Sequence, residues 1–443
     1  MSWKKRLSVL SAAALLTVFT LSGCGSSNDA ASGTASTGTT ASSGKGLTGD
    51  FEVQYFVGGY GDAWWKKVVE EFQTANPDLK IKVSAGPKIN DQMKPRWIGG
   101  NPPDFVYIDG AGLNARQMIE DGQLEDLTEW YKTAKTVDGD LISESLTQAP
   151  EDYSGKTYNI PLALSSWGIF WDKKLFADNN WKAPTDFDSF VAVSKEIKAK
   201  GITPFIHTGI YPYYINNSIL YPAMVSANND DFSILQKIAA NDPEAFKSPA
   251  VMTALNQIVT MRDDGIIDPA AVQLNHTDSQ MLFLQHKDAF IANGLWMPNE
   301  MSKDVPEGFD FGFMPSITQK PGGKSIAVTS TATVGVAAKA KNKEAAYAFI
   351  QFIFAKKQAS QWAELSGAPS NIKGDISASN APAFVKQAAE YLNSKDTIVV
   401  PTITFNADVE KAMNDSTVAL TIGTIDPNGW IERVSAAAQK AAN

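Results

Sequence analysis

Three tyrosines stand close together in the sequence GIYPYYIN, residues 209–216, shortly after His207. A tyrosine ring can give a binding site a flat apolar face, and its hydroxyl group can form a hydrogen bond with a ligand. The same side chain also fills protein cores, where the hydroxyl group finds a partner inside the protein. The segment therefore predicts either a piece of core or the wall of a ligand pocket.

Carboxylates offer a different chemistry, hydrolysis of a glycosidic bond, which needs two acids at a defined separation. The acids available for such a pair are Asp62, Asp109, Glu144, Asp278 and Glu300. The chain has no HExxH motif, no cysteine–histidine spacing typical of a metal site and no GxSxG motif. It also lacks the internal repeats of many adhesion proteins. We therefore expect neither metal nor cofactor, and an enzyme is the less favoured class.

The N-terminus has the features of a secretory signal. A cationic start is followed by an apolar run over residues 7–21, which is too short to be a stable membrane-spanning helix. The run closes with LSGC, residues 21–24, which resembles a bacterial lipobox. We therefore expect a signal peptide over 1–23, and we expect Cys24, the only cysteine, to carry a lipid. That lipid would be the only link to a membrane and would hold the protein on the extracellular face of the cell membrane.

Residues 24–49 consist mainly of Ser, Gly, Thr and Ala, which predicts a flexible linker. The folded part would begin near Asp50 and contain roughly 390 residues, more than one core normally holds, so two lobes are expected. Loss of the three cations of the signal would take the net charge from −9 to −12. Such an acidic chain is a poor binder of nucleic acid and of anionic lipid, and a neutral or polar ligand fits better.

The first part of the folded chain alternates strands and helices. Strands are expected over 51–57, 79–83 and 102–109, with helices between them, and this order predicts a parallel sheet with helices on both faces. Ligands bind beyond the carboxyl ends of such strands. Here these ends are the glycine-rich segment 58–62 and Asp109 with its neighbour Gly110. A simple tight turn is the alternative role for the glycines.

A later helix is expected to begin at Thr185. Asp188 follows three residues later, as in a capping box, and the helix is expected to end at Gly201. The residues expected to face the core are Phe187, Phe190, Val191 and Ile197.

Several motifs resemble those of the carbohydrate solute-binding proteins of ABC importers. The resemblance includes GKTYNIP at 155–161, WDKKLF at 171–176 and the Pro-Thr helix start at 184–185. It continues through 288–301 and 330–354 and so covers nearly the whole chain after the linker. A narrower resemblance, to the branch that binds N-acetylglucosamine and N,N'-diacetylchitobiose, rests on five motifs in order. These are GGYGD, GGNPPD, GITPFIHTGIYPYYIN, HTDSQ and GLWMPNE.

The resemblance implies an α/β fold, the two-lobed fold of periplasmic binding proteins, with hinge-crossing strands between the lobes. The crossings are expected near 162–165 and 330–333, with a third near 368–371. Lobe one would contain 50–163 with 332–369, and lobe two would contain 164–331 with 370–443.

A sugar site needs aromatic rings for the C–H face of the sugar, and carboxylates, amides or imidazoles for its hydroxyl groups. The residues expected to bind the sugar are Tyr60, Asp62, Asp109, Trp167, His207, Tyr213, Tyr214, Trp296, Asn299 and Glu300. Tyr213 and Trp296 match positions at which the maltose-binding relatives contact sugar.

For other candidates an alternative stays open. Tyr211 and Tyr214 flank Tyr213, and at least one of them is expected in the core. His207 is also consistent with a structural role, Asn299 and Glu300 with a solvated loop, and Trp171 is expected in the core.

The resulting hypothesis is a monomeric binding lipoprotein that captures a small sugar and delivers it to the permease subunits of an ABC transporter. The sugar would be N-acetylglucosamine or N,N'-diacetylchitobiose. Another di- or oligosaccharide and, less favoured, a secreted glycosidase are the alternatives.

Overall fold

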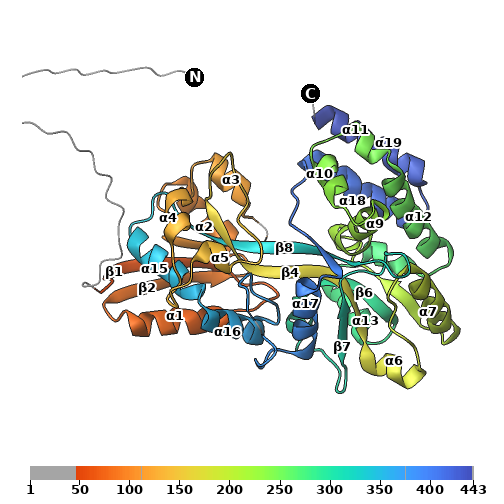
Figure 1. Ribbon diagram of the computed structural model, residues 1–443, viewed down its shortest axis with the longest axis horizontal. Helices are drawn as coiled ribbons and strands as arrows, with labels where there is room; N and C mark the ends of the chain where they lie inside the picture. Colours follow the sequence, from red (N-terminus) through yellow and green to blue (C-terminus); the bar gives the residue numbers. More distant parts are fainter. Residues whose placement is uncertain (1–45, 111, 375, 442–443) are drawn as a thin grey trace, which may run out of the picture. The chain divides into compact units, whose positions relative to one another are not determined.

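The structure is a computed structural model that describes residues 46–110, 112–374 and 376–441 (Figure 1). The expected signal peptide, Cys24 and the expected linker up to residue 45 lie outside the described residues. Leu47 packs against a hydrophobic core, and the first strand begins at Gly49.

The first three strands form a parallel sheet, as the sequence predicts. β1 (Gly49–Phe56) pairs with β2 (Leu79–Gly86) on one side and with β3 (Phe105–Ile108) on the other. α1 (Ala63–Ala75) and α2 (Ile89–Ile98) connect them. The segment 58–62 and Asp109 therefore follow the carboxyl ends of two neighbouring strands.

Two long strands continue the sheet. β4 (Asn159–Asp172) and β8 (Ser325–Val336) run side by side and antiparallel, with a shift of register between Pro161 and Ala163 (Figure 1). β8 pairs with β3 near its C-terminal end, while the second half of β4 pairs with β6 (Asp288–Gly294) and β7 (Phe311–Met314). β5 (Thr203–Ile206) is parallel to β6, and β9 (Thr397–Val400) is parallel to the start of β8.

The two long strands serve two separate cores. Ile160 and Leu162 of β4 lie in the first core, whereas Ile169 and Trp171 of the same strand lie in the second. β8 is shared in the same way, since Ile326 contributes to the second core and its C-terminal half to the first. The fold is therefore two-lobed and α/β, with continuous strands passing from one core to the other.

The chain at 369–371 runs beside β4. The backbone N–H of Asn371 donates a hydrogen bond to the carbonyl of Leu162 at 2.7 Å, and Ser370 forms an isolated bridge with Ala163. The side chain of Asn371 donates to the carbonyls of Pro161 and Gln148. This segment is thus bonded to β4 at the point where the strand leaves the first core.

The remaining helices divide by the hydrophobic cluster against which they pack. The first core and the small cluster beside it receive α3 (Ala115–Glu120), α4 (Thr128–Thr133), α5 (Ile142–Ser145), α15 (Lys343–Ile353) and α16 (Lys356–Ser366). The second core receives α6 (Lys173–Asn179), α7 (Phe187–Ala199), α8 (Tyr213–Ile215), the π-helix η1 (Asn216–Leu220), α9 (Tyr221–Ala227), α10 (Ser233–Ala239), α11 (Pro243–Phe246), α12 (Pro249–Asp263), α18 (Ala407–Thr421) and α19 (Pro427–Ala441). A third cluster receives the 3-10 helix η2 (Pro269–Gln273), α13 (His276–Leu284), α14 (Met297–Glu300) and α17 (Ala383–Asn393).

The start of α7 corrects one sequence expectation. The N-cap is Asp186 and not Thr185, because Asp186 is extended (φ −159°) and its carboxylate accepts a hydrogen bond from the backbone N–H of Ser189 at 2.8 Å. The Ser189 hydroxyl in turn accepts from the backbone N–H of Asp186, which completes the capping box one residue later than expected. Gly201, with φ +78°, ends the helix as expected.

In the part of the chain that the structure describes, no helix combines the length and the apolar character needed to cross a membrane.

Candidate functional site

Trp167 of β4 lies at the centre of a group of rings that we call the aromatic cluster: Trp167, Tyr213, Tyr214 and Trp296. The ring centroid of Trp167 lies 4.7 Å from that of Trp296, 5.3 Å from that of Tyr214 and 5.8 Å from that of Tyr213. All three contacts are edge-to-face, a favourable arrangement for aromatic pairs. The sequence-predicted candidates Trp167, Tyr213, Tyr214 and Trp296 are thus brought together from three separate segments.

A glycine makes room for Trp296. Gly294, at the end of β6, pairs with Trp167 of β4, and a Cβ atom at Gly294 would lie 2.1 Å from the ring of Trp296. The ring therefore lies directly over the glycine, perpendicular to the ring of Trp167. The side chain of Trp296 keeps part of its surface exposed.

The tyrosine segment is not a strand but a turn followed by a helix from Tyr213, although one of the flanking tyrosines is buried as expected. Tyr213 and Tyr214 begin the short helix α8, and their rings stack at 5.0 Å with an interplanar angle of 27°. Tyr214 is the one that packs inward, since it is 4% exposed, whereas Tyr211 and Tyr213 are 38% and 37% exposed. Burial of its hydroxyl, with the nearby charge of Glu300 among smaller causes, raises the pKa of Tyr213 to about 12. Tyr213 thus offers both an open ring and a neutral hydroxyl group.

Tyr60 joins the cluster from the loop after β1. Its ring centroid lies 6.4 Å from that of Trp296 and 5.4 Å from that of Trp362. The side-chain amide of Asn299 donates a hydrogen bond to the carbonyl of Gly59, which ties the same loop to α14. Burial, with the charge of Asp109 as a smaller cause, raises the pKa of the Tyr60 hydroxyl. Burial also raises the pKa of Asp109 itself, although the backbone N–H of Gly110 donates to it.

Glu300 holds a small polar group beside the tyrosines. Its carboxylate accepts a hydrogen bond from the side-chain amide of Gln280 at 2.9 Å and lies 3.6 Å from Nε2 of His276. The imidazole of His276 lies 5.8 Å from the ring of Tyr211. His276 and Gln280 were not among the expected site residues, although both belong to the HTDSQ motif.

Of the expected site residues, Asp62 is engaged in an ion pair elsewhere and His207 is buried. Asp62 forms an ion pair with Lys66 at 2.8 Å at the start of α1. His207 is fully buried after β5, and neither ring nitrogen has a hydrogen-bond partner among the described residues. Burial lowers the pKa of His207 to about 4, so this imidazole is neutral. In this conformation His207 contributes no surface to a pocket.

Two adjoining pockets lie along β4 and β8. The first, which we call the aromatic pocket, has a volume of about 250 Å³ and is lined by Trp167, Tyr213, Asn217 and Glu410 among others. The second, the polar pocket, has a volume of about 460 Å³. Pro401 and Thr402 line both of them, so the two pockets meet at this segment.

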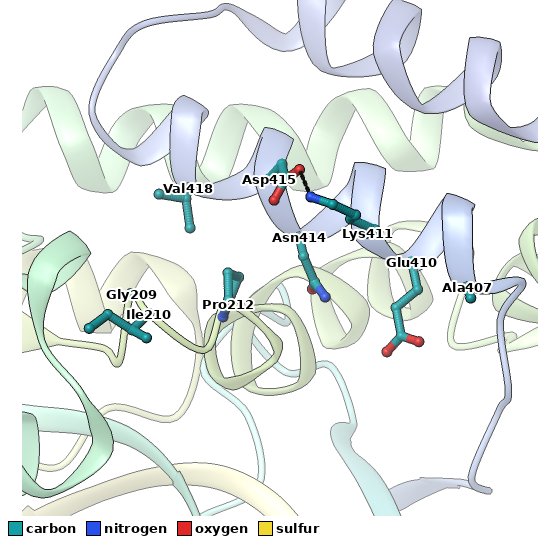
Figure 2. Close-up of a pocket in the computed structure, with 9 residues that line it drawn as sticks. All are labelled: Gly209, Ile210, Pro212, Ala407, Glu410, Lys411, Asn414, Asp415 and Val418. Atoms are coloured by element: carbon teal, nitrogen blue, oxygen red, sulfur yellow. Dashed lines mark hydrogen bonds and ion pairs between the residues drawn. The ribbon is translucent and has the colours of Figure 1, made fainter. Parts of the chain in front are cut away.

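A third pocket, of about 490 Å³, lies between the segment 209–212 and α18 (Figure 2). Its α18 wall carries the ion pair of Lys411 and Asp415 at 2.6 Å, and Asn414 accepts a hydrogen bond from the side chain of Asn216. Glu410 lines both this pocket and the aromatic pocket, and it points away from the Lys411–Asp415 pair in Figure 2.

Several pocket residues were missed from the sequence. These are Asn217, Tyr221, Glu410, Arg116, Glu151 and Tyr153. None belongs to a motif that sets it apart, and only the folded chain brings α3, α9 and α18 to the two pockets. Within the described ranges, no group of three or more His, Cys, Asp or Glu side chains is placed to hold a metal ion.

Relatives among characterised proteins cover most of the chain. The diacetylchitobiose binding protein NgcE of Streptomyces coelicolor is 24% identical over 335 residues, which are 74% of this chain and 70% of the relative. The multiple sugar-binding protein of Streptococcus mutans is 22% identical over 323 residues, 72% of this chain and 75% of the relative.

Solved structures share the fold. A chitin oligosaccharide binding protein superposes with a TM-score of 0.71 at 20% identity and covers 89% of this chain and 99% of that one. The RafE protein in complex with raffinose gives a TM-score of 0.66 at 22% identity, covering 87% and 98%. The sequence profile of the bacterial extracellular solute-binding proteins matches residues 58–360, well over half of the chain. This protein therefore belongs to the bacterial extracellular solute-binding proteins.

Proposed function

We propose that this protein captures a neutral oligosaccharide built from N-acetylglucosamine, with N,N'-diacetylchitobiose as the first choice, and passes it to the permease of an ABC importer. Its family and relatives are sugar-binding proteins of ABC transport and not enzymes. The names of NgcE and of the chitin oligosaccharide binding protein support this particular sugar.

The observation that carries the proposal is the exposed ring of Tyr213 at the edge of the aromatic pocket. The negative face of an aromatic ring attracts the C–H groups of a pyranose, and the packed cluster behind Tyr213 holds that ring in place. Asn217 and Glu410 line the same pocket and offer amide and carboxylate groups for hydroxyls. A few fixed rings with polar groups around them are typical of a site for a neutral polar ligand.

We also propose the hinge and the lobes. The crossings would be 162–165, 330–333 and 368–371, lobe one would contain 50–163 with 332–369, and lobe two would contain 164–331 with 370–443. The bonds between Asn371 and β4 and the sharing of β4 and β8 by two cores support this division. Closure of the lobes about these segments would present both walls to the sugar.

The second candidate is a different oligosaccharide. The relative from Streptococcus mutans is named for several sugars, and the RafE structure holds raffinose. A panel of sugars therefore belongs in every binding measurement.

Replacement of Tyr213 with alanine is expected to weaken binding of N,N'-diacetylchitobiose at least about tenfold, because a central aromatic contact commonly accounts for about 2 kcal/mol. Tyr213→Phe should do less harm, since it keeps the ring and removes only the hydroxyl. Tyr211→Ala is a matched control, because Tyr211 is 38% exposed but does not line the aromatic pocket. Calorimetric titration measures all three variants. Equal losses in Tyr211→Ala and Tyr213→Ala would contradict the assignment of Tyr213 to the site.

We further propose that the protein is a monomer that a lipid on Cys24 holds at the outer face of the cell membrane. Cys24→Ser should still bind sugar but should appear in the medium or remain as unprocessed precursor. Cell fractionation with a blot for the protein checks this expectation. Mature Cys24→Ser protein that stays in the membrane fraction would rule out the lipid anchor.

A further inference from the structure

We infer that the aromatic pocket takes a protonated amine, with the carboxylate of Glu410 as its counter-ion. Oligosaccharides that carry a free amino group in place of an acetamido group are then ligands of this protein as well. This inference rests on the proposed function and extends its ligand class to deacetylated oligosaccharides of N-acetylglucosamine.

The first observation is the isolated charge of Glu410. Among the described residues that line the aromatic pocket, Glu410 is the only charged one. Its carboxylate accepts no hydrogen bond and forms no ion pair within the described part of the chain. Lys411 follows it directly, but Lys411 pairs with Asp415 at 2.6 Å, and Glu410 points away from that pair in Figure 2. The pocket therefore offers one negative charge that no protein cation balances.

The surroundings of this carboxylate favour a cation over a neutral partner. The Glu410 side chain remains accessible, yet burial in the pocket wall raises the pKa of its carboxyl group above the ordinary value. A carboxylate that has lost water without gaining a partner is stabilised most by an opposite charge. A sugar hydroxyl can donate a hydrogen bond to it but leaves its charge uncompensated. A protonated amine donates up to three N–H groups and also supplies the positive charge.

The second observation is the set of rings in the same pocket. Trp167, Tyr213, Tyr221 and Phe405 line it together with Glu410, and the ring centroids of Tyr221 and Phe405 lie 5.4 Å apart. The face of an aromatic ring attracts a cation that lies within about 6 Å of its centre. In a pocket of about 250 Å³, an amine beside Glu410 lies near several of these rings. Burial, with the charge of Glu410 as a smaller cause, raises the pKa of Tyr221, so its hydroxyl stays neutral.

The chemistry of the proposed sugar supplies the amine. Removal of the acetyl group from N-acetylglucosamine leaves a primary amine, which takes up a proton. Because Tyr213 and Glu410 line the same small pocket, one sugar unit can contact both of them. The net charge of the chain is −9, so its long-range field attracts a cationic sugar and does not repel a neutral one.

Calorimetric titrations at neutral pH test the inference with N,N'-diacetylchitobiose and with the same disaccharide after removal of both acetyl groups. Wild-type protein is expected to bind the deacetylated disaccharide at least as tightly as the acetylated one. Glu410→Gln keeps the size and one acceptor oxygen of the side chain and removes its charge. This variant should lose at least about tenfold in affinity for the deacetylated disaccharide and less than about threefold for the acetylated one.

Asp408→Asn is the matched control. Asp408 also lies on α18, and its exposed side chain lines neither the aromatic pocket nor the third pocket. The variant removes the same charge from the same helix, so affinity for both sugars should stay within about twofold of wild type, because solvent and salt screen exposed charges. Glu410→Gln should melt no earlier than wild type, since it removes a charge that has no partner.

The outcomes separate the two proposals. Weaker binding of the deacetylated disaccharide than of the acetylated one by wild type would overturn the amine site and leave the proposed function intact. Equal losses for both sugars in Glu410→Gln would overturn it as well, because the carboxylate would then serve only as an acceptor for hydroxyl groups. Binding of the deacetylated disaccharide alone would support the amine site and contradict N,N'-diacetylchitobiose as a ligand. Binding of neither sugar would contradict both proposals.

Discussion

Trp171→Ala should lower the free energy of unfolding by about 3 to 5 kcal/mol, the usual cost of removing a buried tryptophan. Trp171 is 6% exposed in the second core, and its ring lies over Gly312, where a Cβ atom would come within 2.3 Å of it. The facing Gly312 has no side chain that could fill this space, so a cavity should remain. Denaturant titration measures the change.

The sugar affinity of Trp171→Ala should stay within about twofold of wild type, because Trp171 lines neither the aromatic nor the polar pocket. Trp171→Phe should recover part of the lost stability, since it restores part of the volume. Normal unfolding together with a loss of sugar binding would mean that Trp171 belongs to the site and not to the core.

Trp296→Ala is expected to weaken sugar binding at least about tenfold. Trp296 does not itself line the aromatic pocket, but its ring packs edge-to-face against Trp167, which does, and against Tyr60, so its loss removes the support of both rings. A modest fall in melting temperature should accompany the loss of affinity. Calorimetric titration beside thermal unfolding separates the two effects.

Gly294→Ala gives a sharper version of the same experiment, because it keeps the tryptophan and moves it. The added Cβ would lie 2.1 Å from the Trp296 ring, so the ring must leave its place. Gly374→Ala is the matched control, since apart from its two chain neighbours no atom of the described residues lies within 4 Å of its Cβ position. Gly294→Ala should therefore weaken sugar binding, and Gly374→Ala should not.

Early melting of Trp296→Ala with normal sugar binding would show that Trp296 belongs to the core. Normal sugar binding in Gly294→Ala would show that binding does not depend on the position of the Trp296 ring.

Local pattern was enough to predict the first sheet. In the strands expected over 51–57, 79–83 and 102–109, apolar residues alternate with polar ones or follow one another directly. The segments between these strands contain turn residues and apolar residues at helical spacing, so the strands could be recognised. The start of α7 was missed by one residue because Thr185 and Asp186 can both cap a helix. The fold resolves this choice, since Asp186 is the residue in the extended conformation.

The aromatic part of the site could be predicted only with the help of the family resemblance. The letters of GIYPYYIN suit a strand as well as a helix, and the structure shows a turn followed by the helix α8, with Tyr214 buried and Tyr213 open. His207 was expected in the site from its neighbours, but it is fully buried after β5.

The polar pocket could not be predicted from local pattern. Arg116 and Glu151 are 35 residues apart. In its own sequence segment, each of them looks like an ordinary charged residue on the protein surface. Glu410 lies still further along the chain and reaches the aromatic pocket only because α18 lies beside η1, where Asn216 donates a hydrogen bond to Asn414. Such groupings depend on tertiary packing, so no periodic pattern in the sequence predicts them.

Calorimetric titration of the mature protein with N,N'-diacetylchitobiose, followed by analysis of the recovered sugar, tests the central claim most directly. We predict that one disaccharide binds per chain, that it is recovered intact, and that Tyr213→Ala binds it at least about tenfold more weakly. Hydrolysis of the disaccharide, or the absence of binding to it and to every other sugar of the panel, would contradict a sugar-capturing role.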